Sequence, residues 1–253
     1  MINRNRIFLL LTLSVCTVSF GQKRYDELTE QVSFNSTDDV TIYADLALQD
    51  PEATTIILFH QGGSNVRGEY RYTLPVLYDM GYNILASDLR SGGDLFDQSN
   101  RTVSNLPSDL EVTYCDAESD VQAAIDYATT QGLQKFVLVG SSYTASLVIR
   151  VGAQNKDKVA GIIALSPSSG GPMAPCRPDE IMDGLEVPLL IVRPRREMEI
   201  ESVRQQFELA KSFGHQTYIA ENGVHGSSSL DPSRVEGGVE QHWEVVKRFL
   251  GTL

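Results

Sequence analysis

A serine lies where the sequence changes from a buried strand to a helix. The apolar run 137–139 leads into Gly140, and a helix is expected to begin directly after Ser142. A sharp turn at such a junction presents a serine hydroxyl above the edge of a sheet, where it can attack a carbonyl carbon. Gly140 meets the need for a small residue before the turn, whereas the β-branched Thr144 is expected to crowd the helix against the strand. Ser142 is therefore a candidate nucleophile; the alternative is a serine that only caps the helix.

A pair of glycines follows another buried run. The apolar run that ends at Phe59 is followed by His60, Gln61 and a glycine pair that begins at Gly62. Attack on a carbonyl carbon develops negative charge on its oxygen, and backbone N–H groups that glycine leaves accessible can stabilise that charge. We therefore expect the N–H groups of Gly62 and Tyr143 to form an oxyanion hole, and His60 and Gln61 to contact the substrate. The alternative is an ordinary glycine-rich turn.

A histidine and a glutamate complete the set in chain order. His225 lies between the last expected strand and the last expected helix, and Glu197 follows a buried apolar run. A base on a loop at the same sheet edge could take the serine proton, and a buried carboxylate could orient the imidazole. Glu199 and Glu201 are close rivals, but carboxylates here are also expected to begin the next helix. The order Ser142, Glu197, His225 therefore predicts a catalytic triad.

Strands and helices alternate along the chain, as they must to bring these loops to one edge. This alternation predicts an α/β fold with a mostly parallel central sheet of about eight strands, helices on both faces, and a single domain over residues 22–253. Helices are expected at Asp116–Gln131, with Asp116 as N-cap and Gly132 as stop, from Ile200 onward, and from Val239 to Phe249. Strands are expected at Gln31–Phe34, Val40–Leu48, Thr54–Phe59, Tyr82–Ser87, Phe136–Val139, Val159–Leu165, Leu189–Val192 and Thr217–Ala220.

Two connections are expected to shape the mouth of the site. The segment Ser91–Tyr114 is long and polar and has little periodicity, which is typical of a functional or mobile loop. The segment Ser166–Val187 is short and rich in proline. Both should leave the carboxyl edge of the sheet, where ligands bind in open α/β folds.

With these motifs in this order, the chain resembles the α/β-hydrolase family from Gln31 to Leu250. The run His60–Gly63 looks like that family's oxyanion motif, and Asp88–Gly93 looks like its loop after the fourth strand, in which Asp and Arg brace the turn. The departures are Gln61, Thr144 and a glutamate as the acid. The resemblance implies a serine hydrolase that needs no cofactor or metal. The short connection before the seventh strand leaves no room for a substantial lid.

The leading functional prediction is a secreted serine hydrolase that cleaves small-molecule carboxylic esters. A thioesterase or a small-peptide hydrolase would use the same residues. A catalytically inactive binding protein is the third alternative, and Thr144 is the residue that favours it. A net charge of −12 excludes nucleic acid and anionic membrane surfaces as expected partners, because both need clustered positive charge.

A basic cluster stands out in this acidic chain. Arg193, Arg195 and Arg196 follow the seventh strand, close to the expected acid. They could attract an anionic acyl group. The alternative is a solvated loop whose charges offset nearby acids.

The N-terminus predicts export. Arg4 and Arg6 precede a short apolar stretch, and small residues end at Gly21, so residues 1–21 are expected to be a signal peptide cut before Gln22. The expected location is secreted or periplasmic, without stable membrane insertion. The alternatives are an uncut anchor and a lipoprotein acylated at Cys16.

Export changes how the two remaining cysteines are interpreted. Cys115 lies at the end of the first mouth segment, and Cys176 lies near the end of Ser166–Asp179, the proline-rich part of the second that is expected to shape the mouth. In an oxidising compartment we therefore expect a disulfide that holds these segments together. The alternative is two separate buried thiols. No cysteine or histidine spacing predicts a metal site.

Overall fold

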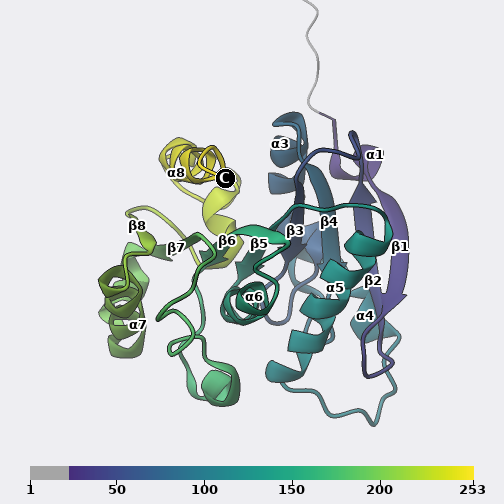
Figure 1. The fold of residues 1–253 in the computed structure, drawn as a ribbon, viewed down its shortest axis with the longest axis horizontal. Coiled ribbons are helices and arrows are strands. Elements are labelled where there is room, and N and C mark those ends of the chain that lie inside the picture. Colours follow the sequence, from purple (N-terminus) through teal and green to yellow (C-terminus); the bar gives the residue numbers. More distant parts are fainter. Residues whose placement is uncertain (1–22) are drawn as a thin grey trace, which may run out of the picture.

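The computed structural model describes residues 23–253 and contains one eight-stranded sheet (Figure 1). The expected signal peptide and Cys16 lie outside the described residues. The strands run in the spatial order β1-β2-β4-β3-β5-β6-β7-β8. Their bounds are β1 Glu30–Asn35, β2 Thr41–Ala47, β3 Thr55–Phe59, β4 Asn83–Asp88, β5 Phe136–Ser141, β6 Val159–Leu165, β7 Leu189–Pro194 and β8 Gln216–Ala220.

The expected mostly parallel sheet is confirmed. Only β1 and β2 are antiparallel to their neighbours, and every pairing from β4 to β8 is parallel. Strands β3, β4 and β5 are buried along their whole length, which explains the apolar runs within them, Ile56–Phe59, Ile84–Ala86 and Phe136–Val139. The carboxyl ends of β3 to β8 therefore share one edge, and the candidate residues all follow these ends.

Helices cover both faces of the sheet, because side chains of each inner strand alternate between two cores. In β3, Ile57 and Phe59 pack with α5, α6 and α7, whereas Ile56 and Leu58 pack with α1, α2, α3 and α8. Within residues 23–253, no helix combines the length and apolar character of a membrane span. The bounds are α1 Tyr25–Leu28, α2 Val66–Glu69, α3 Thr73–Asp79, α4 Arg101–Ser104, α5 Glu118–Thr130, α6 Tyr143–Gln154, α7 Glu201–Ser212 and α8 Glu240–Leu250.

Helix α5 begins differently from the prediction. Asp116 is not its N-cap, because a short 3₁₀ helix over Cys115–Ala117 precedes the α-helix. The Asp116 carboxylate instead accepts hydrogen bonds from the backbone N–H and the hydroxyl of Thr113. The expected end is confirmed, since Gly132 has a φ of +83° just after the helix.

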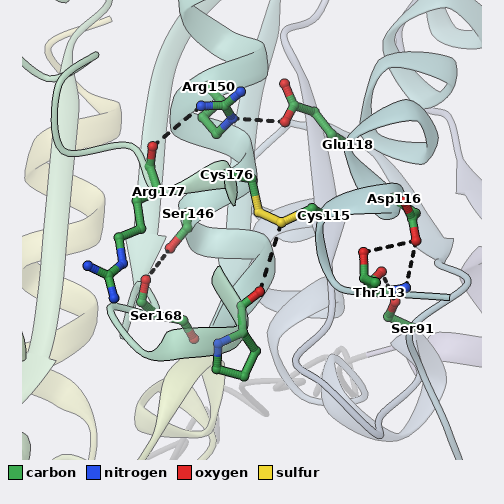
Figure 2. The surroundings of a disulfide bond; sticks show 11 residues. Ser91, Thr113, Cys115, Asp116, Glu118, Ser146, Arg150, Ser168, Cys176 and Arg177 are labelled. Carbon is green, nitrogen blue, oxygen red and sulfur yellow. Dashed lines mark hydrogen bonds and ion pairs between the residues drawn. A yellow bond between two sulfur atoms is a disulfide. The ribbon is translucent and has the colours of Figure 1, made fainter. Parts of the chain in front are cut away.

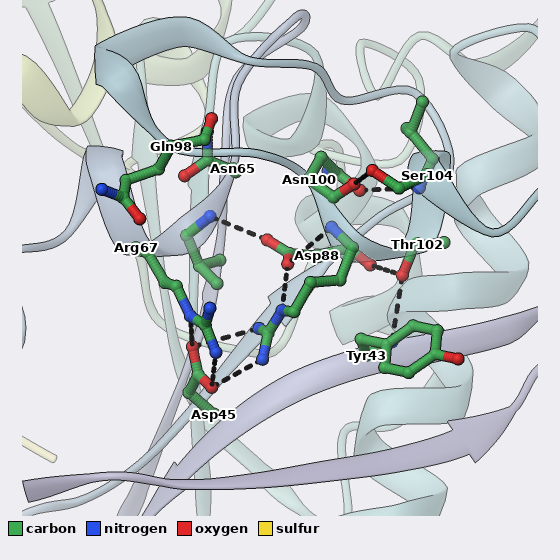
Figure 3. A network of polar contacts seen from close by, with 12 residues as sticks. Tyr43, Asp45, Asn65, Arg67, Asp88, Gln98, Asn100, Thr102 and Ser104 are labelled. Atoms are coloured by element: carbon green, nitrogen blue, oxygen red, sulfur yellow. Dashed lines mark hydrogen bonds and ion pairs between the residues drawn. The ribbon is translucent and has the colours of Figure 1, made fainter. Parts of the chain in front are cut away.

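The segment Ser91–Tyr114 is not the irregular loop that its sequence suggests. It contains α4, and Arg101 at the start of α4 forms ion pairs with Asp88 and Asp45 (Figure 3). Burial by itself would lower the pKa of Arg101, but the charges of Asp88 and Asp45 hold it above its ordinary value. Asn100 donates hydrogen bonds to the carbonyl groups of Ser64 and Leu89. The first half of this segment is thereby fixed to the core.

The turn after β4 is braced by an aspartate and an arginine, as the resemblance implies. Asp88 accepts a hydrogen bond from the N–H of Val66, which starts α2. The buried Arg90 pairs with Asp120 and Asp38, which lie on α5 and in the β1–β2 turn. These contacts hold the loops around the carboxyl edge of the sheet.

Candidate active site

The candidate nucleophile occupies a strained turn. Ser142 joins β5 to α6 with φ of 63° and ψ of −118°, a region that residues other than glycine rarely adopt. Its N–H donates to the carbonyl of Leu165 at 2.9 Å, and its own carbonyl accepts from the N–H of Ser168 at 3.1 Å. Bonds to β6 and to the segment after it therefore hold the strained serine in place.

The expected crowding by Thr144 is wrong, because its hydroxyl joins the elements that meet there. The side chain is fully buried, and its Oγ1 lies 3.0 Å from each of the carbonyl oxygens of Phe59 and His60. The same oxygen accepts a hydrogen bond from the N–H of Ser141 at 2.8 Å. The backbone of α6 instead lies closest to the strand at Gly140, where an added Cβ would be 2.6 Å from the Cα atom of Ala145.

Two backbone N–H groups flank this turn. Tyr143 is the first residue of α6, so its N–H has no acceptor within the helix. Among the described residues, the N–H of Gly62 also has no acceptor. An added Cβ at Gly62 would lie 2.7 Å from the hydroxyl oxygen of Tyr114, so a larger residue here would displace that ring. Both expected oxyanion donors are thus free to bind an oxygen.

His60 is buried rather than facing a substrate, which corrects the sequence prediction. Its side chain is fully buried, and Nε2 accepts a hydrogen bond from the N–H of Leu89 at 2.8 Å. Nδ1 lies 2.8 Å from the carbonyl oxygen of Gln61 and therefore carries the proton. Because backbone groups occupy both ring nitrogens, His60 positions the oxyanion loop. Gln61 is partly exposed at the surface of that loop.

A buried carboxylate that the sequence does not indicate links two loops of the site. Glu69 is 1% exposed; one of its oxygens accepts from the N–H of Gln61 at 2.9 Å. The other oxygen accepts from the hydroxyl of Ser227 at 2.5 Å. Glu69 thus connects the loop of Gly62 to the loop of His225. The sequence around it has no motif that could have indicated this role.

The candidate acid and base are in direct contact. His225 Nδ1 lies 2.6 Å from Oε1 of Glu197, and the Ser166 hydroxyl donates to the same oxygen at 3.1 Å. Burial opposes ionisation of Glu197, but the hydrogen bond and charge of His225, with the charge of Arg193, lower its pKa below the ordinary value. Glu197 is therefore a carboxylate at neutral pH.

The basic cluster is divided between the interior and the surface. Arg193 is buried and donates to Oε2 of Glu197 at 3.2 Å and to Gln206 at 2.6 Å. Burial lowers the pKa of Arg193 to about 10, so it keeps its charge at neutral pH. Arg195 forms an exposed ion pair with Glu221. Arg193 therefore supports the candidate acid and does not face an anionic ligand.

The loop of His225 lies against the serine turn. The N–H of Ser227 donates to the hydroxyl of Ser141, and the N–H of Gly226 donates to that of Ser166, both at 3.0 Å. The imidazole is 44% exposed. No hydrogen bond joins Ser142 to His225 within the described structure; the Ser142 hydroxyl oxygen lies 3.3 Å from that of Ser168.

Solved structures share this arrangement of strands and helices. The chain is similar to an esterase of Pyrococcus furiosus, with a TM-score of 0.68 and 17% identity over 92% of this chain and 94% of that one. The chain has the α/β-hydrolase fold. A protein of Klebsiella pneumoniae assigned as a dienelactone hydrolase gives a TM-score of 0.65 and 16% identity, over 89% of this chain and 98% of that one.

A larger protein contains the same fold as one of its parts. The acylaminoacyl peptidase of Pyrococcus horikoshii gives a TM-score of 0.64 and 17% identity, over 88% of this chain and 41% of that one. No protein-family model matches the chain, and no curated protein sequence matches it significantly. Among residues 23–253 of this α/β-hydrolase fold, no group of three or more His, Cys, Asp or Glu side chains could hold a metal ion.

The two segments at the mouth of this α/β-hydrolase fold are joined by a disulfide. Cys115 and Cys176 are bonded, with their Cα atoms 5.7 Å apart, so the predicted pairing is confirmed (Figure 2). Cys115 precedes α5, and Cys176 ends the 3₁₀ helix Gly171–Cys176, which lies between β6 and β7. The bond therefore fixes the end of the first mouth segment to the second.

Breaking this bond is expected to cost about 4 kcal/mol of unfolding free energy. The two cysteines are 61 residues apart in the sequence, and a cross-link over a loop of this length restricts the unfolded chain strongly. Urea unfolding of wild type and of the Cys115→Ala/Cys176→Ala double variant measures the loss. A change below about 1 kcal/mol would contradict the expectation.

Replacing Tyr143 with phenylalanine is expected to leave activity within about twofold of wild type. The Tyr143 hydroxyl is buried without a hydrogen-bond partner among the described residues, and the expected oxyanion donor is the backbone N–H, which the variant keeps. Removing an unpaired hydroxyl should raise the unfolding free energy by about 1 kcal/mol. Steady-state kinetics and urea unfolding test both parts. A large loss of kcat would give the hydroxyl itself a role.

Proposed function

We propose that this protein is a serine hydrolase that cleaves carboxylic esters of small molecules. The observation that carries the proposal is the position of Ser142. It lies in a strained turn at the start of α6, and the loop of His225, whose imidazole is hydrogen-bonded to a buried carboxylate, packs against that turn. Nucleophilic acyl transfer needs these three parts together. Hydrolases and a peptidase are among the proteins of similar fold.

The proposed reaction has two halves. Ser142 Oγ attacks the ester carbonyl carbon while Nε2 of His225 takes its proton, and the N–H groups of Gly62 and Tyr143 bind the oxygen as it becomes negative. The carbon–oxygen bond to the alcohol breaks, and His225 gives the proton to the leaving oxygen. Water then attacks the acyl-enzyme with the same base and releases the acid and free Ser142.

The carboxylate of Glu197 serves both halves. It accepts a hydrogen bond from Nδ1 of His225, which leaves Nε2 unprotonated and able to take the serine proton, and it stabilises the imidazolium that forms. Arg193 and Ser166 hold the carboxylate in this orientation. For the first proton transfer, the hydroxyl of Ser142 turns from Ser168 toward His225.

Three alternatives to ester hydrolysis have less support. A thioester or a small peptide would be cleaved by the same steps, and neither has a contact in this site that favours it over an ester. The inactive binding protein depended on Thr144 as a disruptive residue. Because Thr144 forms hydrogen bonds that join α6 to β3 and β5, no observation now favours that alternative.

We also propose that the mature enzyme acts outside the cytoplasm. The N-terminal segment has the pattern of a signal peptide, and the disulfide between Cys115 and Cys176 is of a kind that persists in oxidising compartments. Mass spectrometry of the intact protein from the periplasm or medium of an expressing host tests this. A mature N-terminus at Gln22 is the expected result, and uncut protein in the cytoplasm would contradict it.

A fluorophosphonate probe tests the proposed chemistry. It reacts only with an activated serine, so wild type should be labelled and Ser142→Ala should not. Ser212→Ala is a matched control, because Ser212 is an exposed serine on α7. Absence of labelling on well-folded wild type would show that Ser142 is not activated.

A further inference from the structure

A cavity of about 800 Å³ lies beside the candidate oxyanion loop. Its volume falls within the range of pockets that hold small organic ligands. One of its walls comes from the segment Ser91–Tyr114, and Pro172 closes it from the second mouth segment. Its lining includes Gly63, Arg90, Leu110, Val112, Tyr114 and Pro172.

The cavity adjoins the place where the ester carbonyl would bind. Gly63 lines it and follows directly after Gly62. Tyr114 also lines it; the hydroxyl of Tyr114 lies against Gly62, and its ring stacks on that of Tyr143 with centroids 4.6 Å apart. Tyr114 thus forms a shared boundary between the cavity and both expected oxyanion donors. An ester whose carbonyl oxygen bound to these donors would therefore lie beside Tyr114, at the border of the cavity.

The walls are suited to an uncharged group. Arg90 is the only charged residue that lines the cavity, and its guanidinium is already paired with Asp120 and Asp38. No lining charge is therefore left to attract a carboxylate or an ammonium group. A second cavity of about 780 Å³, near α1, is lined by several charged side chains and contains no residue of the site.

The apolar side chains of the cavity are exposed in the free protein. Leu110 is 44% and Tyr114 is 36% exposed, and both are among the few large apolar residues at the surface. Leu95, 46% exposed, lies within 4 Å of the position of an added Cβ at Gly63. Apolar surface gathered at the edge of a site gains free energy when an apolar ligand covers it.

The disulfide holds the walls of the cavity in place. Tyr114 is adjacent to Cys115 in the chain, and the sulfur of Cys115 lies 4.0 Å from the carbonyl oxygen of Pro172 (Figure 2). Both walls are therefore anchored at the same covalent link. A preformed wall binds its ligand without the cost of ordering a loop.

We propose that this cavity binds an uncharged, apolar group of the ester, on either the acyl or the alcohol side. The proposal rests on the function proposed above and assigns the substrate class. The preferred substrates are esters of medium-length or branched apolar acids or alcohols, and acetyl esters of small alcohols and esters with a charged group next to the carbonyl are poor substrates.

Two substrate series test this with two wall variants and a matched control. The first series lengthens the acyl group of p-nitrophenyl esters from acetate to octanoate, and the second enlarges the alcohol of acetate esters from ethyl to naphthyl. Leu110→Ser removes an apolar wall residue outside the catalytic residues. Leu48→Ser is the control, because Leu48 is 45% exposed and does not line the cavity. Val112→Ser provides a second, independent change of the same wall.

In wild type, kcat/KM should rise along at least one series. In Leu110→Ser and Val112→Ser, the preference for the large over the small member of that series should fall about fivefold, with activity on the smallest member unchanged. Leu48→Ser should behave like wild type. Unchanged preference in both wall variants, with acetate still hydrolysed and the serine still labelled, overturns only the cavity assignment. No hydrolysis and no labelling of folded wild type overturns the proposed function as well.

Discussion

Replacing Ser142 with alanine is expected to lower kcat for ester hydrolysis by about a thousandfold or more. The nucleophile forms the acyl-enzyme, and the oxyanion donors that remain accelerate the attack of water only weakly. Alanine accepts the φ of 63° about as poorly as serine does, so the fold should be kept. Stopped-flow or steady-state assays with p-nitrophenyl esters measure the loss, and circular dichroism checks the fold.

Ser141→Ala distinguishes the two neighbouring serines. Ser141 is fully buried, and its hydroxyl accepts the N–H of Ser227, which follows Gly226 in the loop of the histidine. Its removal should reduce activity moderately, through the position of His225, by about tenfold or less. An active Ser142→Ala together with an inactive Ser141→Ala would show that the nucleophile is Ser141.

Replacing Glu197 with glutamine is expected to lower kcat by about a hundredfold to ten-thousandfold. The amide cannot balance the charge of the imidazolium, and it can favour the wrong tautomer of His225. Glu199→Gln is the control, because Glu199 is exposed and lies two residues away on the same 3₁₀ helix, Arg195–Glu199. Near-normal turnover in Glu197→Gln, or loss in Glu199→Gln, would assign the role of the acid elsewhere.

The same substitution should also affect stability, with a defined pH dependence. The pKa of Glu197 is lowered in the folded protein, so its carboxylate contributes stability above its unfolded pKa of about 4.3. That contribution is lost as the pH falls through the lower, folded pKa. Glu197→Gln also leaves the buried Arg193 without its partner charge. Activity assays are therefore made well below the Tm. The variant Glu197→Asp keeps the charge and should retain more activity and more stability than Glu197→Gln.

The eight strands and the chain order of the candidate residues were determined by the sequence alone. Buried parallel strands need unbroken apolar runs, because both of their faces are covered, and such runs as Phe136–Val139 and Val159–Leu165 are visible without a structure. Parallel strands bring their carboxyl ends to one edge. The loops of Ser142, Glu197 and His225 could therefore be placed together before their contacts were known.

The tertiary structure decided what each side chain does within those loops. His60 is buried and positions the oxyanion loop, and the hydroxyl of Thr144 joins three elements by hydrogen bonds. Arg193 points inward and pairs with Glu197. Glu69 links two loops that are distant in the chain. These roles depend on which backbone groups remain without partners when the chain has folded. A buried polar side chain is stable only where it meets such groups, and residues far apart in the sequence supply them.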